Sequence, residues 1–366
     1  MTNTTFRWEE HLRKPVGKVS PVSRTQRAMI SSGPLSCPPN PDAQSCVFNS
    51  YNVGDSVELL SGSLGQQLKG TVQLLLTSPP FPLNDKKRYG NKMGNEYLEW
   101  FSHLATIWSP LLTPTGSIVV ELGNAWEPGR PIQSLLPLKA VLSFVEAPNA
   151  DLRLCQEFVC HNPARLPTPA QWVTVEHIRA VDSFTHVWWM SRSDKPKSNT
   201  RQVLRPYSSS MKELLAKGTY NAGKRPSGHT IGKTSFLKDN GGSLPHNVLG
   251  VDAEDPQEAI NLLSASNTTS TDYFGRRCRE LGLTPHPARM SSKLAEFFIN
   301  LLTDPGDLVL DPFAGSNTTG ACAQKLDRQW ISIEVDQEYE RQAQIRLENP
   351  EIRDQPKASG GTHGNS

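Results

Sequence analysis

The sequence predicts an α/β fold, in which helices cover both faces of an open sheet and a ligand binds beyond the carboxyl ends of the strands. Three short apolar runs carry this prediction, at residues 72–76, 307–311 and 330–334. Each run is bounded by glycine, proline or polar residues, which is typical of strands buried on both faces of a sheet. Each also leads into residues that can hold or react with a ligand.

The run 72–76 continues into Thr77-Ser78-Pro79-Pro80-Phe81-Pro82. Proline cannot donate to a strand ladder, so the strand ends here. The exocyclic amine of a nucleobase is a weak nucleophile, and acceptors that hold its two N–H groups favour a tetrahedral, reactive nitrogen. The Ser78 oxygen and a carbonyl of Pro79-Pro80 can be those acceptors, while Phe81 offers a face for a base taken out of the helix. The alternative is a plain proline turn with Phe81 in the core.

The run 307–311 continues into small residues and a helix start at 312–320. Small residues let a ligand approach the backbone, and free N–H groups at a helix start can face a carboxylate. The run 330–334 ends in Glu334, which can accept hydrogen bonds from two ribose hydroxyls, as in dinucleotide-binding sheets. No Gly-x-Gly-x-x-Gly is present, which disfavours a nicotinamide cofactor.

Asp-Pro-Phe-Ala-Gly-Ser-x-Thr-Thr together with Thr-Ser-Pro-Pro-Phe resembles the S-adenosylmethionine-dependent amino-methyltransferases of DNA, in their β order of motifs. Over residues 47 to 347 the chain is most similar to the PvuII-type cytosine-N4 modification methyltransferases. The further motifs behind this resemblance are Val187-Trp188-Trp189, Arg225-Pro226-Ser227-Gly228-His229, Lys238-Asp239-Asn240-Gly241-Gly242-Ser243, His286-Pro287-Ala288-Arg289 and Gly315-Ser316-Asn317-Thr318-Thr319-Gly320.

The resemblance implies a Rossmann-like methyltransferase fold with a mixed seven-stranded sheet, helices on both faces and permuted motifs. It implies methyl transfer from S-adenosylmethionine to cytosine N4 in double-stranded DNA, within a restriction–modification system. The catalytic candidates are Ser78, Pro79, Pro80, Phe81 and Glu121, and the cofactor candidates are Asp55, Thr77, His286, Pro287, Asp311, Pro312, Phe313, Ala314, Gly315, Ser316, Thr318, Thr319 and Glu334.

Several alternatives stay open from the sequence. Glu121 is either a site residue or a surface carboxylate, and His286-Pro287 is either part of the cofactor pocket or structural. Asp55 contacts the cofactor, or Asp55 or Ser56 caps a helix, and both roles can coexist. The reaction alternatives are adenine-N6 methylation on the same scaffold and an inactive DNA-binding module.

Charge is unevenly distributed along the 366 residues. The whole chain has a net charge of +2, but residues 192–238 hold eleven Lys or Arg and two acids. Such a basic stretch suits a phosphate backbone, although a solvated loop is the alternative. It predicts a target-recognition region with no regular structure. The DNA-binding candidates are Lys86, Lys87, Arg201, Arg205, Lys224, Arg225, His229, Lys233 and Lys238.

None of the six cysteines comes directly after a proline, and their spacing does not match that of metal ligands. We therefore expect reduced thiols and no metal, and no nucleophilic cysteine of the kind that ring-carbon methylation uses. No apolar run approaches the ~18 residues of a membrane span, and the start lacks an export signal. These features predict a protein of the bacterial cytoplasm. We expect a monomer that acts on a short DNA site, shared with a cognate endonuclease that it does not contact.

The predicted organisation has five parts: a disordered basic arm (1–45), a catalytic half (46–191), the target-recognition region (192–268), a cofactor-binding half (269–349) and a flexible tail (350–366). The expected strands are 46–53, 72–76, 117–123, 154–159, 184–191, 307–311 and 330–334. The expected helices are 57–68, 96–112, 130–146 with a break at Pro137, 291–302 and 336–347.

Overall fold

The computed structural model describes residues 48–82, 92–162, 165–250, 273–286 and 289–349. The predicted arm at 1–45 and the tail at 350–366 lie outside these ranges. So do three site candidates, Lys86, Lys87 and Pro287.

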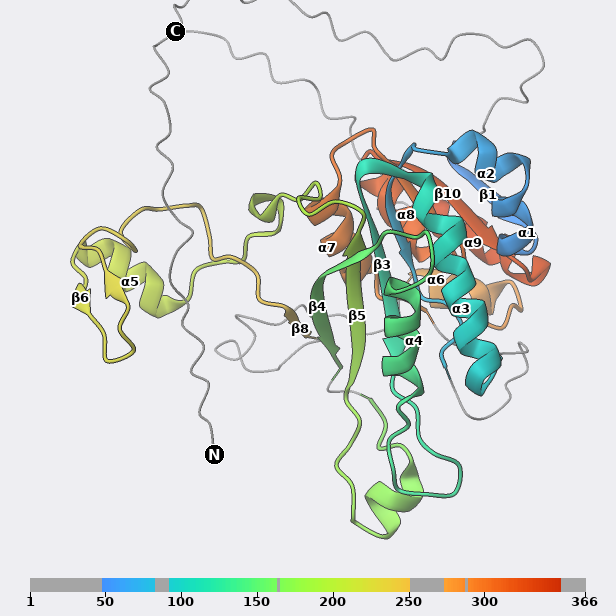
Figure 1. The fold of residues 1–366 in the computed structure, drawn as a ribbon, viewed down its shortest axis with the longest axis horizontal. Helices are drawn as coiled ribbons and strands as arrows, with labels where there is room; N and C mark the ends of the chain where they lie inside the picture. The colour runs from blue at the N-terminus through green and yellow to red at the C-terminus, as the bar shows by residue number, and fades with distance from the viewer. Residues whose placement is uncertain (1–47, 83–91, 163–164, 251–272, 287–288, 350–366) are drawn as a thin grey trace, which may run out of the picture. The chain divides into compact units, whose positions relative to one another are not determined.

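One mixed sheet forms the centre of the described chain (Figure 1). Its strands, in spatial order, are β1 (Ser50–Val53), β10 (Gln329–Glu334), β9 (Leu308–Asp311), β2 (Val72–Thr77), β3 (Leu112–Gly123), β5 (Phe184–Ser191), β4 (Arg153–His161) and β8 (Val248–Gly250). All pairs are parallel except those that β5 makes with β3 and β4. The sheet has eight strands rather than the seven predicted, because β8 pairs with the outer edge of β4.

The strand order brings distant parts of the chain together. β9 pairs with β2, with Leu75 opposite Leu310, although the two strands are more than 200 residues apart in sequence. Because these strands are parallel, the segments that follow Thr77 and Asp311 leave the same edge of the sheet. The strands that end at Thr77 and at Asp311 are therefore neighbours in the sheet.

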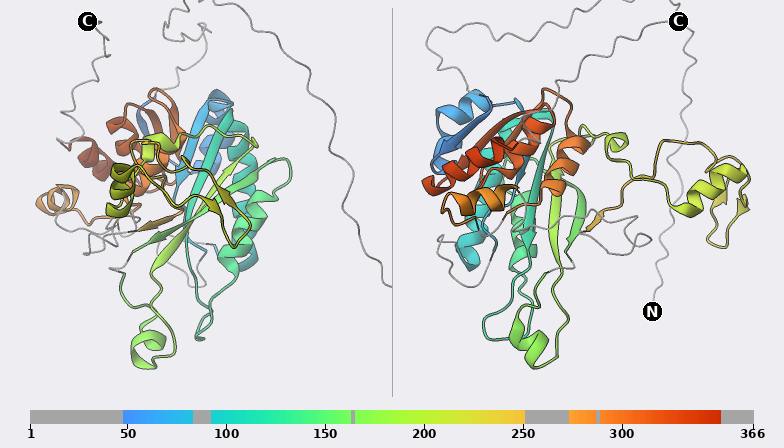
Figure 2. Two further views of the ribbon diagram at one scale, coloured as in Figure 1. Left: turned by 90° about the vertical axis from the view of Figure 1, so that its left-hand side faces the viewer. Right: turned by 180° about the vertical axis from the view of Figure 1, so that it is seen from behind.

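Helices cover both faces of the sheet (Figures 1 and 2). One face packs against α1 (Ser56–Ser61), α2 (Ser63–Leu68), α3 (Gly94–Trp108) and α4 (Leu136–Val145). The other face packs against α7 (Ser292–Leu302) and α8 (Thr318–Lys325). A small third cluster joins α6 (Tyr273–Glu280) to α9 (Glu340–Leu347).

The helix α3 illustrates how the apolar pattern determines packing. Its buried residues, Tyr97, Phe101, Leu104, Ala105 and Trp108, recur every three or four positions and form one face. The Phe101 and Phe144 rings lie 4.8 Å apart, which ties α3 to α4. The helix ends four residues before the predicted Leu112, because Pro110 provides no N–H and a 3-10 turn, Ser109–Leu111, follows.

Several predicted boundaries were wrong. The predicted helix 57–68 is two helices that meet at Gly62. The predicted helix 130–146 begins only at Leu136, and Pro137 lies in its first turn, where a missing N–H costs little. The first strand begins at Ser50 instead of Cys46, and β3 begins at Leu112 instead of Ser117.

The predicted recognition region contains regular structure that the sequence analysis missed. Within it lie a 3-10 helix (Thr200–Val203), α5 (Ser209–Lys217) and a small hairpin of β6 (Gly223–Lys224) and β7 (Thr230–Ile231). The Ser208 hydroxyl caps α5, and Gly218 ends it in the left-handed conformation. Arg205 and Ser243 exchange two backbone hydrogen bonds, which closes the intervening segment into a loop.

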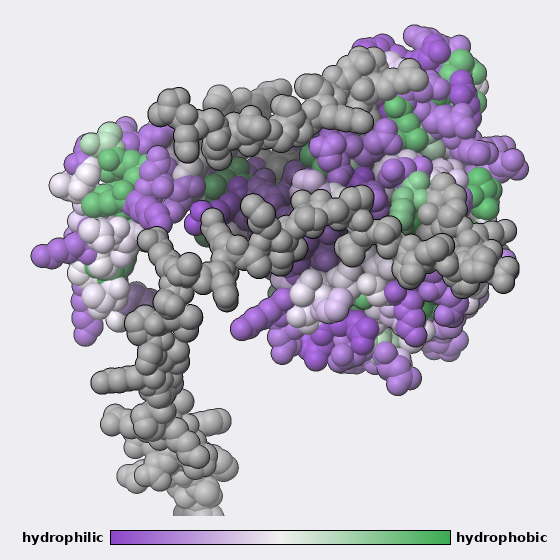
Figure 3. All heavy atoms as spheres, turned by 90° about the horizontal axis from the view of Figure 1, so that it is seen from above, coloured by the Kyte–Doolittle hydropathy of each residue, from purple (hydrophilic) through white to green (hydrophobic). Residues whose placement is uncertain are grey.

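The described surface in Figure 3 is mostly hydrophilic, with small hydrophobic patches. No helix in the part of the chain that the structure describes is long and apolar enough to cross a membrane.

Candidate active site

The segment after β2 accepts a hydrogen bond from a tyrosine of α3. Ser78 is half-buried and Pro79 is buried. The Tyr97 hydroxyl, fully buried in α3, donates to the Pro80 carbonyl at 2.9 Å. Among the described residues, the Pro79 carbonyl has no such donor. Of the two proline carbonyls that the sequence offered as acceptors, the Pro80 carbonyl is therefore already hydrogen-bonded, which leaves the Pro79 carbonyl as the candidate acceptor for an amine.

Phe81 lies over the end of the neighbouring strand. The ring is half-buried and packs against the core that includes α3. A Cβ added at Gly123 would lie 2.5 Å from two atoms of this ring, so only glycine leaves room for it. The core packing that we gave as the alternative is thus present on one side of the ring. Stacking on a base stays a prediction for its other side.

Glu121 is a buried carboxylate beside Ser78. Its side chain is 3% exposed, and the Thr185 hydroxyl on β5 donates to its Oε1 at 2.9 Å. Burial raises the pKa of Glu121, while hydrogen bonds from Thr185 and Ser78 and the charge of Arg165 act against that increase. The alternative that Glu121 is a surface carboxylate is wrong.

Asp311 is connected to the segment after β2 through Thr77. The Thr77 hydroxyl donates to Asp311 Oδ1 at 2.7 Å, and the Phe313 N–H donates to the same oxygen at 3.1 Å. Both Thr77 and Asp311 are buried. Burial raises the pKa of Asp311 to about 6, although hydrogen bonds from Thr319, Thr77 and Phe313 oppose this effect. Thr77 therefore positions Asp311 and directly links the end of β2 to the end of β9.

Glu334, at the end of β10, and Gly315, after β9, lie at the same edge of the sheet and are hydrogen-bonded to each other. The Gly315 N–H donates to Glu334 Oε2 at 2.8 Å, and the Asp336 N–H donates to Oε1 at 3.1 Å. Burial raises the pKa of Glu334. Tyr51, which the sequence analysis did not single out, donates from its hydroxyl to the Gly315 carbonyl at 2.7 Å. Only the pairing of β1 with β10 reveals its place in the site.

Gly315 adopts φ = +49° and His286 lies against it. A Cβ at Gly315 would be 3.2 Å from His286 Nε2, so the imidazole and the glycine backbone are in close approach. Asn317, at the start of α8, also has a left-handed backbone, and its Oδ1 accepts from Ser332. Its buried Nδ2 has no hydrogen-bond partner within the described residues.

The remaining cofactor candidates have mainly structural contacts. Ser316 is buried against the guanidinium of Arg346, with its Oγ 3.1 Å from Nε and 3.0 Å from Nη2. Phe313 packs edge-on against Trp100 and Trp108. Pro312, Ala314, Thr318 and Thr319 are buried around the start of α8. Asp55 accepts from the N–H groups of Val57 and Glu58 and so caps α1, which confirms the capping alternative.

The DNA-binding candidates that the structure describes differ in their surroundings. Arg201, Lys224, His229, Lys233 and Lys238 are exposed. Arg205 takes part in the backbone pairing with Ser243. Arg225 donates to the Tyr220 hydroxyl and to the Asn221 carbonyl, which holds its guanidinium beside the hairpin.

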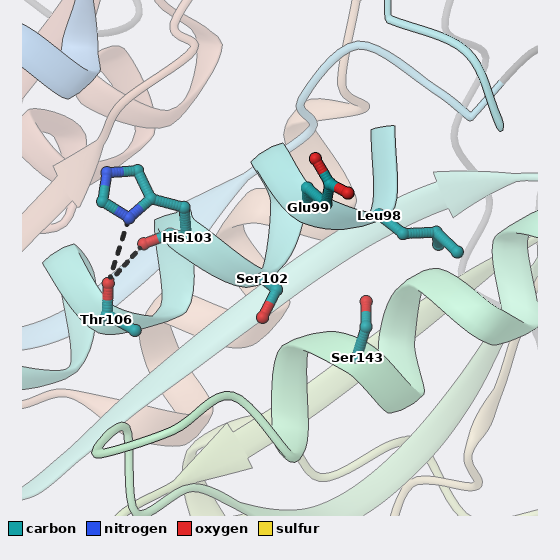
Figure 4. Close-up of a pocket in the computed structure, with 6 residues that line it drawn as sticks. All are labelled: Leu98, Glu99, Ser102, His103, Thr106 and Ser143. Atoms are coloured by element: carbon teal, nitrogen blue, oxygen red, sulfur yellow. Dashed lines mark hydrogen bonds between the residues drawn. The ribbon is translucent and has the colours of Figure 1, made fainter. Parts of the chain in front are cut away.

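A separate hollow of about 460 Å³ lies between α3 and α4 (Figure 4). It is lined by Leu98, Glu99, Ser102, His103, Thr106 and Ser143. It shares no residue with the site at the end of β2, so we assign it no part in that site. Within the described ranges, no three His, Cys, Asp or Glu side chains are grouped to hold a metal ion.

Three comparisons with known proteins agree with this architecture. Residues 72–345 match a family model described as DNA methylase. The Type II methyltransferase M.PvuII of Proteus hauseri is 41% identical over 292 residues, which are 79% of this chain and 81% of that protein. The solved structure of PvuII DNA methyltransferase (cytosine-N4-specific) superposes with a TM-score of 0.61 and 33% identity, covering 81% of this chain and 86% of that chain. The DNA adenine methyltransferase YhdJ of Escherichia coli K12 is 44% identical over 63 residues, which are 17% of this chain and 21% of that protein.

Proposed function

The chain belongs to the DNA methylase family, and on that premise we propose that it transfers a methyl group from S-adenosylmethionine to the exocyclic N4 of cytosine in double-stranded DNA. The observation that carries this proposal is the hydrogen bond from Thr77 to Asp311. It joins the end of β2, where Ser78 can hold an amine, to the end of β9, where small residues and a helix start can hold a cofactor. Methyl donor and acceptor then meet at one edge of the sheet.

Ser78 and the Pro79 carbonyl are the acceptors for the two amine N–H groups. The amine must also lose a proton when its nitrogen gains a methyl group. Glu121 is buried, interacts with Ser78 and has a raised pKa, so it can take that proton through the serine hydroxyl. Phe81 supports the base that has left the duplex. Holding the reactants in line accounts for much of the expected rate.

The residues around Gly315 fit an adenosine cofactor with an amino-acid tail. Glu334 carries a carboxylate that can accept from ribose hydroxyls, and Gly315 leaves its backbone open beside His286. The buried Nδ2 of Asn317 and the first N–H groups of α8 are donors for a carboxylate. S-adenosylmethionine, when bound, supplies an activated methyl group on a positively charged sulfur. The other cofactor candidates complete this proposed set: Asp55, Thr77, Asp311, Pro312, Phe313, Ala314, Ser316, Thr318 and Thr319. Pro287 lies outside the described residues.

Cytosine N4 is favoured over adenine N6 as the methylated position, because the similarity to M.PvuII extends over much more of the chain than the similarity to an adenine methyltransferase. The match to M.PvuII covers most of both chains, whereas the match to an adenine methyltransferase covers a short segment. The serine at position 78 agrees with this choice, because adenine enzymes of this scaffold more often have Asp or Asn there.

We propose a restriction–modification system as the biological setting of this reaction. The chain is the modification enzyme of a restriction–modification system in the bacterial cytoplasm, and it acts as a monomer on a short duplex site. A cognate endonuclease shares this site without contacting the chain. The basic loop between Arg205 and Ser243, together with Arg201 and the Lys86-Lys87 pair, contacts the DNA.

Mass spectrometry of nucleosides tests the proposal. Purified protein is incubated with unmethylated bacterial DNA and S-adenosylmethionine, and the DNA is then digested. We expect N4-methyldeoxycytidine with the wild-type chain and none above background with Ser78→Ala. N6-methyldeoxyadenosine would keep the fold and the cofactor but overturn the base. DNA binding without any methylated base and without S-adenosylmethionine binding would support an inactive DNA-binding module instead.

A further inference from the structure

Two loops extend from the carboxyl end of β3 and from the neighbouring ends of β4 and β5. They are residues 124–135, between β3 and α4, and the described residues 165–183 of the connection between β4 and β5. Figures 1 and 2 show both loops side by side beyond the ends of the strands. They start at the edge that carries Glu121 and Ser78. Any duplex that delivers a base to Ser78 must therefore pass close to them.

The two loops contact each other through a hydrogen bond and a cation–π interaction. Asn124 Nδ2 donates to Asp182 Oδ1 at 2.8 Å, and the Arg179 guanidinium lies 4.3 Å from the centre of the Trp126 ring. Arg165 donates to the Phe184 carbonyl at 2.9 Å, next to Thr185, which holds Glu121. The longer loop is thus connected to the catalytic carboxylate through two adjacent residues.

The tip of the longer loop has a fixed backbone. A single helical turn, Gln171–Val175, is closed by the Glu176 N–H, which donates to the Gln171 carbonyl. The N–H groups of Ile178 and Arg179 both donate to the Trp172 carbonyl. The residues after the turn are therefore presented in one conformation rather than on a loose strand.

This fixed tip exposes apolar side chains. Val175 is 65% exposed, Ile178 is 56% exposed and Val181 is 43% exposed. Three exposed apolar side chains thus lie within the seven consecutive residues 175–181 of an otherwise hydrophilic surface (Figure 3), which suits the binding of an apolar partner. A duplex from which one base has been removed offers an apolar partner, because the bases above and below the gap have lost their stacking neighbour.

We propose that Val175 and Ile178 form an apolar wedge that enters the duplex at the position vacated by the target cytosine. This inference rests on the proposed function, because it assumes that the base is taken out of the helix. The wedge fills the gap, covers the exposed base faces and keeps the cytosine from returning to the stack. The loop thereby stabilises the extrahelical state, while Ser78 and Glu121 act on the amine.

The test compares two duplexes that contain the sequence found methylated by the wild-type protein. In one, the target cytosine is paired with guanine, and in the other it lies opposite an abasic site. We expect the double variant Val175→Ser/Ile178→Ser to lower the single-turnover methylation rate on the paired duplex at least about tenfold. On the abasic duplex its rate should stay within about threefold of wild type, because little unpairing is required there.

Leu142→Ser is the matched control, since Leu142 on α4 is 57% exposed, nearly the same as Ile178. It should methylate both duplexes at the wild-type rate. An equal loss on both duplexes by the double variant, or no loss on the paired duplex, would overturn the wedge. So would a wild-type dimer that the double variant converts to a monomer, because the patch would then serve self-association. If the wild-type chain methylates no DNA sequence from which such duplexes can be built, the proposed function itself fails.

Discussion

At Asp311, burial and hydrogen bonding act in opposite directions on one carboxylate. Burial raises its pKa to about 6, and donors on Thr319, Thr77 and Phe313 limit the increase. The folded chain therefore binds a proton at this residue more tightly than the unfolded chain does. Stability must then fall as pH rises from about 4 to about 6, by up to about 3 kcal/mol for a difference of this size.

Asp311→Asn should remove that pH dependence. The amide oxygen can still accept from Thr77 and from the Phe313 N–H, so the fold is retained. Relative to wild type, the free energy of unfolding of the variant should increase by up to about 3 kcal/mol between pH 4 and pH 7. Urea unfolding at the two pH values measures this difference. A difference that does not change with pH would mean that Asp311 titrates in the same range in both states.

Gly123 controls the position of Phe81. A Cβ at residue 123 would lie 2.5 Å from the ring, so Gly123→Ala must displace Phe81 from the end of β3. We expect a ten- to hundredfold lower single-turnover methylation rate, because small displacements of a positioning group have effects of about that size. Affinity for S-adenosylmethionine should not change.

The double variant Gly123→Ala/Phe81→Leu separates strain from function. Leucine relieves the overlap, so the thermal stability lost in Gly123→Ala should return while the methylation rate stays low. Recovery of the rate as well would show that the aromatic ring has no role in holding the base.

At the scale of single elements, chain patterns predicted the buried strands well and the helix limits less well. The strand predicted at 184–191 has the observed limits at both ends, because the apolar, β-branched and aromatic residues stop abruptly there. The helix 57–68 was predicted as one piece because Val57, Leu60, Leu64 and Leu68 keep a helical spacing across the break at Gly62. The helix α5 has no buried residue, so it lacks the periodic apolar face on which such a prediction depends.

The cap of α1 allows the two roles of Asp55 to be separated. Asp55→Ala should lower the free energy of unfolding by about 1 kcal/mol, because the N–H groups of Val57 and Glu58 lose their acceptor. Asp55→Ser should be nearly as stable as wild type, since a serine hydroxyl can cap the helix. If the carboxylate also holds the cofactor, calorimetry should find binding of S-adenosylmethionine weakened about tenfold in both variants. Wild-type affinity in Asp55→Ser would leave Asp55 with the capping role alone.

At the scale of the whole molecule, the sheet order makes an active site from two ends of the sequence. Parallel pairing of β2 with β9 could be predicted, because each strand ends in residues with complementary chemistry and both strands are buried. The eighth strand could not be predicted, since Val248–Gly250 is three residues long and its pairing depends on β4. Nor could the links from Tyr97 to Pro80 and from Tyr51 to Gly315, because contacts between distant segments leave no periodic signal.

The assignment of the amine to Ser78 is tested by two measurements on Ser78→Ala, namely single-turnover methyl transfer and binding of S-adenosylmethionine. The two measurements address different parts of the proposed site, because Ser78 follows β2 while Asp311, Gly315 and Glu334 lie at the ends of β9 and β10 or just beyond them. We predict a transfer rate at least about a hundredfold lower, with cofactor affinity within about twofold of wild type. A variant that binds the cofactor normally and still transfers the methyl group at the wild-type rate would contradict the assignment of the amine to Ser78.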